Sequence, residues 1–453
     1  MTNIIQGRPT KKFFIDMITR DISIEDAIID LIDNSIDGAN RLHPDKDSTF
    51  ESLYVKLTLN KDEFIIEDNC GGFSLETAQK YAFRFGRPDD VTPKLNNSVG
   101  RFGIGMKRSL FKMGKHFSVE SKHKENHFKV DVDVEQWSKQ TICDNNGQQI
   151  DDWNFSYINI TDQEGLRVDG TYIKVEKLNE ELENLFNDEH FLTDLSTDIQ
   201  RILNFSLARK MNIILNGKSL VGNKVELLMS QEYKIMPYFK DGNIGGVSYK
   251  IIAGIGVTGH PKESGWYIYC NNRLVVEADQ STITGWHMNG LPQWAVKHAM
   301  FRGLLFLDSP DTIKLPLTTT KKGIDVTSNI YQAVLPLMQD AMRRVNVFLN
   351  EIDNLGAYAN DYRKQLGESL HAYSAVQLKM KDFSNQERGK FYAPKIDKDN
   401  PVVKENTRRI SYTVSKDIAD AALEHSGARS YKELGEKTFN YYIKLECIED
   451  EEY

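Results

Sequence analysis

The spacing of apolar residues between positions 24 and 41 predicts an amphipathic helix. Apolar side chains recur there every three or four residues, and acidic or amide side chains occupy positions between them. The apolar positions are Ile24, Ile28, Leu31, Ile32 and Ile36. The polar positions are Asp30, Asp33, Asn34 and Asp37. We therefore expect one side of this helix to face a core and the other to present a row of polar groups.

Strand patterns follow this helix. Residues 53–60 and 63–69 alternate or run apolar with β-branched side chains and stop at turn formers, which is typical of strands. After a glycine-rich stretch from Gly86 to Gly114, the same pattern predicts strands at 116–121, 127–134, 155–161 and 171–178. These segments predict a sheet that is backed by helices.

A second series of strand patterns predicts a separate α/β unit. It comprises residues 211–217, 247–257 and 265–276, and it follows a helical segment at about residues 190–209. A helical pattern then runs from Val326 to about Lys381, and a polar stretch with two prolines follows it. We predict a first domain at 1–205, a second domain at 206–335, a helical segment at 336–381, a linker at 382–407 and a small strand-helix-helix unit at 408–453.

Composition limits the class of protein. The chain has 453 residues, of which 40% are hydrophobic and 27% are charged, as in folded globular proteins. It has no run of about 18 apolar residues and no secretion signal at its start, so we expect a cytoplasmic protein with no membrane partner. The four cysteines form no CxxC pair, which argues against a zinc site. Because the net charge is −8, any nucleic-acid site must be local.

The polar side of the helix could hold a cation. Asp30, Asn34 and Asp37 are four and three residues apart, so their side chains line one face. An amide oxygen such as that of Asn34 suits Mg²⁺, and a nearby carboxylate can orient an attacking water. A solvated polar surface is the alternative interpretation of this row.

Two glycine segments follow in order. Asp68 ends an apolar strand just before Gly71 and Gly72, and a carboxylate there can accept a hydrogen bond from the amine of a flat base. Gly100, Gly103 and Gly105 precede a predicted helix from Met106 to Met113, where free amides can cradle phosphate. Residues 84–99 between the two segments predict a lid. A plain turn, a glycine hinge and a passive surface loop are the respective alternatives.

Taken in order, these segments resemble the motifs of the GHKL superfamily (DNA gyrase B, heat-shock chaperones, histidine kinases and MutL), and within it MORC-like proteins. The segments are DLIDNSIDGA, DNCGGF, GRFGIG and DGTYIKV. The resemblance implies an α+β fold, with a Bergerat-type ATP-binding α/β sandwich followed by an S5-like α/β transducer domain. It implies ATP and Mg²⁺ as cofactors, ATP hydrolysis, and a homodimer that closes when ATP binds.

The resemblance also implies a role for single residues. Asp30 would activate water, Asn34 would ligate Mg²⁺, Asp68 would receive the adenine amine, and Thr171 would support Asp68. Other nucleotide-binding positions would be Asp37, Gly72, Gly100, Arg101, Phe102, Gly103, Ile104, Gly105, Met106 and Lys107. Two positions depart from the family pattern, since Asp30 replaces the usual Glu and Cys70 replaces a glycine.

In the family's second domain, a lysine reaches the γ-phosphate of ATP. The segment PLTTTKKGID offers Lys321 or Lys322 for this role, and we favour Lys321. A solvated lysine pair is the alternative. A histidine kinase is not expected, because only about 23 residues precede the helix. An ATP-binding scaffold or chaperone with little hydrolysis remains a second hypothesis, because Asp30 is shorter than Glu.

The end of the chain resembles a ribbon-helix-helix unit. In that family two chains pair their strands, which would turn Ile410, Tyr412 and Val414 inward. The alternate residues Arg409, Ser411 and Thr413 would then face a DNA major groove. The alternative is a dimerisation or docking module that never contacts DNA. We therefore expect a homodimer as one partner, DNA through residues 408–453 or an effector protein as another, and a role such as prokaryotic defence against foreign DNA.

Overall fold

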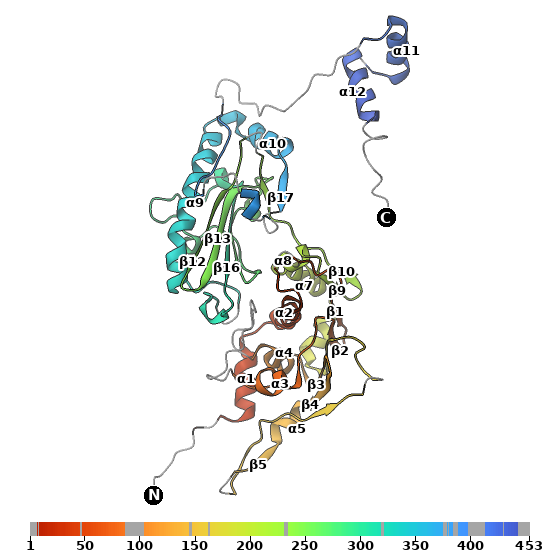
Figure 1. The fold of residues 1–453 in the computed structure, drawn as a ribbon, viewed down its shortest axis with the longest axis vertical. Helices are drawn as coiled ribbons and strands as arrows, with labels where there is room; N and C mark the ends of the chain where they lie inside the picture. The colour runs from red at the N-terminus through yellow and green to blue at the C-terminus, as the bar shows by residue number, and fades with distance from the viewer. Residues whose placement is uncertain are drawn as a thin grey trace. The chain divides into compact units, whose positions relative to one another are not determined.

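The chain folds into two compact units, residues 1–403 and 404–453, each of which is described by itself. The computed structural model describes residues 7, 9–45, 48–86, 104–144, 147–161, 164–230, 234–318, 321–374, 378, 380–383, 388–396, 413–428 and 430–442. The first unit contains two large sheets, each with helices packed against it (Figure 1).

The first large sheet has eight strands in the order β10-β9-β1-β2-β8-β3-β4-β7. Its pairs are antiparallel except that of β9 with β1, which is parallel. Its strands are β1 (Tyr54–Leu59), β2 (Glu63–Asp68), β3 (Gly114–His123), β4 (Asn126–Asp133), β7 (Tyr157–Asn159), β8 (Gly170–Leu178), β9 (Asn212–Leu215) and β10 (Lys218–Ser219). A separate hairpin joins β5 (Thr141–Cys143) to β6 (Gln149–Asp151).

Helices cover one face of this sheet, with α2 and α4 packed against each other at its centre (Figure 1). The predicted helix is present as α2, and it begins where the Ser23 hydroxyl accepts a hydrogen bond from the Asp26 amide at 3.2 Å. The helices are α1 (Lys11–Arg20), α2 (Ile24–Leu42), α3 (Leu75–Thr77), η1 (Ala78–Ala82), α4 (Gly105–Met113), α5 (Val134–Lys139), α6 (Glu180–Leu185), α7 (Glu189–Ile202) and α8 (Asn204–Ala208).

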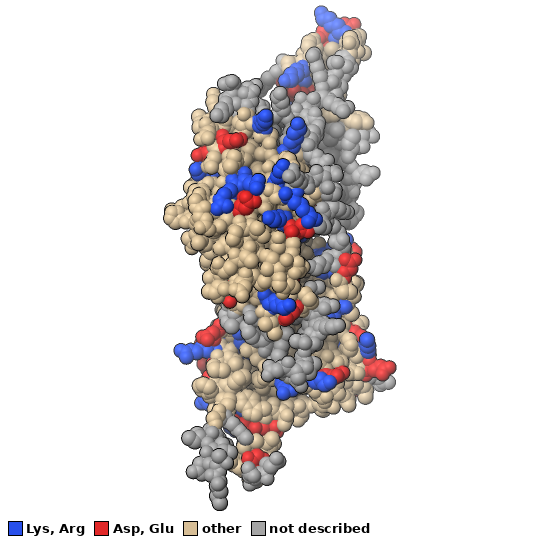
Figure 2. Space-filling model, turned by 60° about the vertical axis from the view of Figure 1, so that its left-hand side comes forward, with Lys and Arg blue, Asp and Glu red and all other residues tan. Residues whose placement is uncertain are grey.

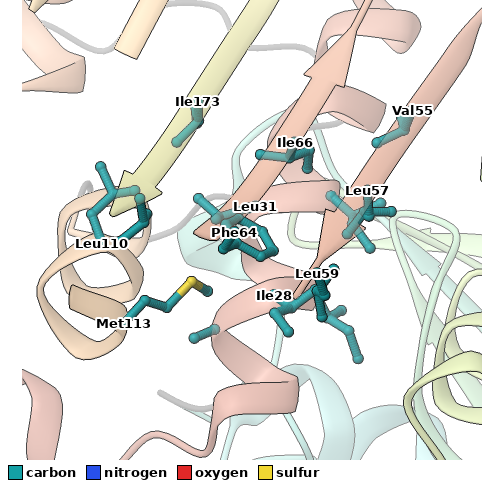
Figure 3. Close-up of a cluster of buried hydrophobic side chains, with 14 of the residues drawn as sticks. Ile28, Leu31, Val55, Leu57, Leu59, Phe64, Ile66, Leu110, Met113 and Ile173 are labelled. Carbon is teal, nitrogen blue, oxygen red and sulfur yellow. The ribbon is translucent and has the colours of Figure 1, made fainter. Parts of the chain in front are cut away.

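The core lies between α2, α4 and the sheet (Figure 3). Alternation along the strands supplies its sheet side, because every second side chain of β1 and β2 points inward. The labelled members are Ile28, Leu31, Val55, Leu57, Leu59, Phe64, Ile66, Leu110, Met113 and Ile173. Asp68 continues the inward register of Phe64 and Ile66, so the strand itself carries a carboxylate into the buried layer beneath α2.

The second large sheet has five strands in the order β12-β13-β16-β14-β15, with β14 parallel to β16. The long helix α9 packs on β12, β13 and β16, and its apolar face closes a second core. The strands and helices are β12 (Tyr238–Ile244), β13 (Val247–Ile255), β14 (Gly265–Cys270), β15 (Arg273–Asp279), β16 (Phe301–Asp308), α9 (Asn329–Asp353) and α10 (Ala359–Ser369).

Short elements complete this part of the chain. The strand β11 (Glu226–Leu228) pairs with β17 (Ala372–Ser374) outside both large sheets. Six short 3-10 helices are described in the same part, namely η2 (Pro261–Glu263), η3 (Thr282–Thr284), η4 (Val296–His298), η5 (Thr312–Lys314), η6 (Gly356–Tyr358) and η8 (Met380–Phe383).

The packing of the chain differs from the predicted domain boundaries in three places. The predicted second domain includes residues 211–217, but β9 pairs with β1 and belongs to the first sheet. The predicted helical segment 336–381 is not separate, because α9 begins at Asn329 and forms part of the second core. The predicted linker 382–407 is packed over part of its length, since Phe383, Phe391 and Ile396 contact these cores. Periodicity predicts a strand or helix but not its packing partner.

The small unit contains α11 (Lys416–Ser426) and α12 (Tyr431–Tyr442) in its described part. The turn after α11 is at Gly427, whose φ of 62° suits glycine. No described side chain of this unit is buried. Most of the predicted strand, residues 408–412, lies outside the described residues, and Thr413 and Val414 belong to no helix or strand.

The pairing of β9 with β1 makes a testable prediction. Ile213 on β9 is completely buried, so Ile213→Ala is expected to lower the free energy of unfolding by about 2–5 kcal/mol, measured by urea denaturation. Val221, which follows β10, is 72% exposed and provides the control. Val221→Ala should change this free energy by less than about 0.5 kcal/mol. Equal effects of the two variants would contradict an interior position for β9.

Candidate functional site

The helix α2 presents one exposed side chain in an otherwise buried stretch. Every residue from Asp26 to Ala39 is buried except Asn34. The core covers one side of the helix, and α4 together with charged residues from the second sheet covers much of the other. Asn34 is therefore the residue of this row that is open to a ligand, while Asp30 and Asp37 lie below the surface.

The Asp68 carboxylate accepts hydrogen bonds from three neighbouring groups. The Ser35 hydroxyl donates to its Oδ2 atom at 2.6 Å, and the Cys70 amide donates to Oδ1 at 2.8 Å. The amide of Thr171, its partner across the β2–β8 pair, also donates to this carboxylate. Burial raises the pKa of Asp68 to about 6, and these three hydrogen bonds oppose the rise. An ionised carboxylate held in this way still has lone pairs that can accept a hydrogen bond from an amine.

Glycines allow the close approach of backbone segments around Asp68. A Cβ atom on Gly72, whose φ is 54°, would collide with the carbonyl oxygens of Lys122 and Gly170. The missing Cβ of Gly72 therefore serves first the packing of the turn on β3 and β8.

Gly38 on α2 lies against the turn at Cys70. A Cβ atom at Gly38 would be 2.5 Å from the carbonyl oxygen of Cys70, which is closer than a side chain tolerates. Glycine at this position therefore allows the helix to pack closely on the turn.

The first turn of α4 lies beside Asp30. A Cβ atom built on Gly105 would be 3.5 Å from Asp30 Oδ2, so the start of this helix lies close to the carboxylate. Ile104 precedes the helix as its N-cap, and Met106 is partly buried in its first turn. The other predicted members of the phosphate loop, Gly100, Arg101, Phe102 and Gly103, lie outside the described residues.

Lys107 points toward the segment that precedes the predicted lid. Its ammonium nitrogen donates to the carbonyl oxygen of Ala82 at 2.6 Å and lies 5.5 Å from the ring centre of Phe85. Burial lowers the pKa of Lys107 to about 7. Phe85 itself packs among aromatic rings that include Phe111 and Trp153, and these contacts hold the first residues of the predicted lid in place. Of the predicted lid, residues 84–86 are described and residues 87–99 are not.

A cluster of buried charges joins α2, α4 and the second sheet. Lys321 Nζ lies 3.0 Å from Asp30 Oδ1 and 3.2 Å from Asp33 Oδ2. Arg108 on α4 lies 2.8 Å from Asp30 Oδ2, and Arg273 at the start of β15 donates to Asp33 Oδ2. Although burial alone would raise it, the pKa of Asp30 is lowered by Lys321 and the neighbouring arginines. Asp30 is thus a carboxylate with both of its oxygens paired.

The cluster separates the two adjacent lysines. Lys321 is buried and contacts Asp30, whereas the half-exposed Lys322 pairs with Asp26 at 2.8 Å. The structure therefore brings the favoured lysine, and not its neighbour, to the predicted catalytic carboxylate.

Sequence reasoning missed several residues of this site. Arg108, Asp33 and Ser35 are adjacent to predicted positions, but nothing in their spacing assigns their contacts. Arg273 carries a usable signal, because it is the one charged residue in the otherwise apolar hairpin GWYIYCNNRLVV. A charge at such a position requires a buried partner.

The described residues contain neither a membrane-spanning helix nor a group of side chains arranged to hold a metal ion. Within the described ranges, no helix combines the length and the apolar character that a membrane span needs. No group of three or more His, Cys, Asp or Glu side chains in the described part is arranged to hold a metal ion. A magnesium ion at Asn34 would thus take its other ligands from phosphate oxygens and water, as is usual for this ion.

Part of the chain is similar to a known family of proteins. Residues 22–164 match a family model described as "Histidine kinase-, DNA gyrase B-, and HSP90-like ATPase". A search of curated proteins gave no match to the chain. The matched residues include α2, Asp68 and the start of α4, which are the elements that build the site. This part of the chain is therefore similar to a GHKL-type ATPase domain, which supports ATP binding.

Proposed function

We propose that this protein is a MORC-like ATPase that binds ATP·Mg²⁺, hydrolyses it, and uses the nucleotide to close a lid and a homodimer. The observation that carries this proposal is the contact of Lys321 with Asp30 at 3.0 Å. It connects the loop after the second sheet with the catalytic helix, beside the first turn of α4. A lysine in that position is able to report whether a third phosphate is present.

Each part of the site has a physical task in this proposal. Asp68 accepts a hydrogen bond from the adenine amine, while Ser35 and the Cys70 amide keep the carboxylate oriented. Amides at the start of α4 hold phosphate oxygens. Asn34 holds Mg²⁺, which when bound neutralises phosphate charge. Asp30 accepts a proton from the attacking water.

The pairing of Asp30 couples substrate binding to catalysis. Both oxygens of this carboxylate are bonded to cations, one to Lys321 and one to Arg108. Each paired oxygen of Asp30 keeps a further lone pair, but the two cations make this carboxylate a weaker base. The γ-phosphate competes with Asp30 for Lys321, so its arrival makes Asp30 a better acceptor for the proton of the attacking water.

The short side chain of Asp30 supports a second candidate function, an ATP-binding scaffold with little hydrolysis. Asp30 is one methylene shorter than glutamate, and a displacement of about 1 Å from the reactive position can lower a rate roughly a hundredfold. A protein with this site would bind ATP, change shape and release it slowly.

The small unit supports a homodimer. Helices of 11 and 12 residues are marginal in isolation, and none of the described side chains of α11 and α12 is buried. Apolar side chains are instead exposed, among them Ile418, Tyr431 and Phe439. Pairing with a second copy would cover them, as the ribbon-helix-helix resemblance implies.

The closing homodimer is proposed to act on DNA, for example in prokaryotic defence against foreign DNA. The net charge of −8 requires a local basic surface for such a contact. Figure 2 shows that charge is unevenly distributed on one face, where Lys and Arg side chains gather in one area with Asp and Glu side chains among them, and another area is almost uncharged. An effector protein is the other proposed partner.

Hydrolysis is tested at Asp30. We expect Asp30→Ala to lower magnesium-dependent phosphate release by at least about a hundredfold, because the base is lost. Its affinity for ATP, measured by calorimetry, should persist or rise, because Lys321 loses a competing carboxylate. The control is Asp26→Ala, which removes the partner of the half-exposed Lys322 and should leave phosphate release within about twofold of the original rate. ATP binding without any phosphate release in the unmodified chain would favour the scaffold instead.

The adenine contact is tested by pH. The ligand needs the carboxylate form of Asp68, whose pKa is raised to about 6 by burial. Affinity for adenosine, which has no phosphate to titrate, should be constant above about pH 7 and fall roughly tenfold per pH unit below about 6. Calorimetry at a series of pH values measures this.

The matched variant for this pH series is Asp68→Asn. It places an NH₂ group against the donors of Ser35 and Cys70, and it should bind adenosine weakly at every pH. Unchanged affinity in Asp68→Asn would refute the assignment of Asp68. A flat pH profile in the unmodified chain would refute the role of its ionisation.

The small unit is tested by comparing the full chain with residues 1–403, the compact first unit. We expect the full chain to be dimeric without nucleotide and the shortened chain to be monomeric, as measured by light scattering. We also expect the shortened chain to lose most of its gel shift with duplex DNA at about 0.1 M salt, since phosphate contacts weaken with salt. Loss of the dimer with an equal shift would mean that the unit only dimerises.

A further inference from the structure

The side chain of Arg273 extends from the second sheet into the charge cluster on α2. Arg273 opens β15, directly after the turn at Asn271 and Asn272, whose φ values are 47° and 68°. The Asn271 side chain fixes this turn, because it donates to the Ser309 carbonyl oxygen at 3.0 Å and accepts from the Ser309 amide at 2.9 Å. The position of Arg273 is thus set by a rigid hairpin.

Arg273 and Lys321 share one acceptor. Both cations contact Asp33 Oδ2, and Lys321 also contacts Asp30. Asp33 is 2% exposed and Arg273 is 3% exposed, so water screens these interactions weakly. Because Arg273 partly neutralises Asp33, it weakens the attraction between Asp33 and Lys321.

Lys321 is consequently held between two carboxylates, Asp30 and Asp33. Asp30 is opposed by Arg108, and Asp33 is opposed by Arg273, so each carboxylate already has a second cation. Without Arg273, Lys321 would be the cation that remains beside the buried Asp33 carboxylate among the described residues. The lysine would then be bound too tightly to leave for a phosphate.

We propose that Arg273 is a positioning residue that occupies Asp33 and thereby leaves Lys321 available to the γ-phosphate of ATP. This inference rests on the proposed function of the site, because it assigns Lys321 to that phosphate. Arg273 itself acts through Asp33 and does not contact the nucleotide. It is thus a determinant of the preference for a nucleoside triphosphate over a diphosphate.

The preference is measured as the ratio of the dissociation constants of Mg²⁺·ADP and of the non-hydrolysable Mg²⁺·β,γ-imido-ATP, by calorimetry on the full chain. Arg273→Met should lower this ratio by about tenfold or more, the range expected when a buried charge pair is broken. Affinity for ADP should stay within about twofold, because ADP offers no γ-phosphate to Lys321. An unchanged ratio in a folded Arg273→Met variant would overturn the proposal.

A double variant distinguishes positioning from direct contact. In Arg273→Met combined with Asp33→Asn, the competing carboxylate is gone, so the ratio should return to within about threefold of the original value. If Arg273 itself bound the phosphate, the ratio would stay low, and the proposal would be wrong. If Arg273→Met alone does not fold, the double variant decides by the same two outcomes. Arg273→Lys keeps the charge and should keep most of the preference.

The control is Arg302→Met. Arg302 is an equally buried arginine on β16 that pairs with Glu263 at 2.9 Å, away from α2. Its loss should lower stability without changing the nucleotide ratio. A parallel fall of the ratio in Arg302→Met would show that any buried arginine of the second sheet has this effect, which would overturn the specific role of Arg273.

Lys321→Met separates this proposal from the function on which it rests. It should abolish most of the preference for the triphosphate. If the unmodified chain binds neither nucleotide, or if Lys321→Met keeps the preference, the proposed function fails. If Lys321→Met loses the preference and Arg273→Met retains it, the inference about Arg273 fails by itself.

Discussion

The ion pair between Asp30 and Lys321 is the interaction on which the arrangement of the first unit depends. Moving two charges out of water costs several kcal/mol for each, and this cost is offset only when the partners and their further hydrogen bonds are well placed. Arg108, Asp33 and Arg273 supply those further contacts. The two large sheets must therefore keep their relation for the charges to stay satisfied. Any ligand that enters the cluster changes the balance that holds them.

The Asp68 end of the site depends on a simpler constraint, the two-residue period of a strand. Phe64, Ile66 and Asp68 point to the same side of β2, and the first two are core residues. The carboxylate is thus as firmly placed as the core beneath it. Its high pKa is a consequence of the same burial, and the three donors around it limit that cost. Recognition at one end of the site is consequently rigid, while the charge cluster at the other end can rearrange.

Much of this could be predicted from the sequence, and what could not has a common cause. The helix α2, its polar row, and the strands β1 to β4 and β8 follow from local periodicity or from the motifs. The parallel addition of β9 to β1 and the contact of Arg273 with Asp33 join residues more than 150 positions apart. No local pattern encodes such partners. Gly38 was missed for the same reason, because its smallness matters only against the carbonyl of Cys70.

The place of β9 in the first sheet has a consequence for how the chain is made. The stretch that matches the family model ends at residue 164, yet β1 gains its second neighbour only at residues 212–215. Synthesis proceeds from the N-terminus, so one edge of β1 stays unpaired until more than 150 further residues have been made. Contacts this distant in sequence form slowly. The nascent nucleotide domain thus passes through a period in which its open edge needs protection from other chains.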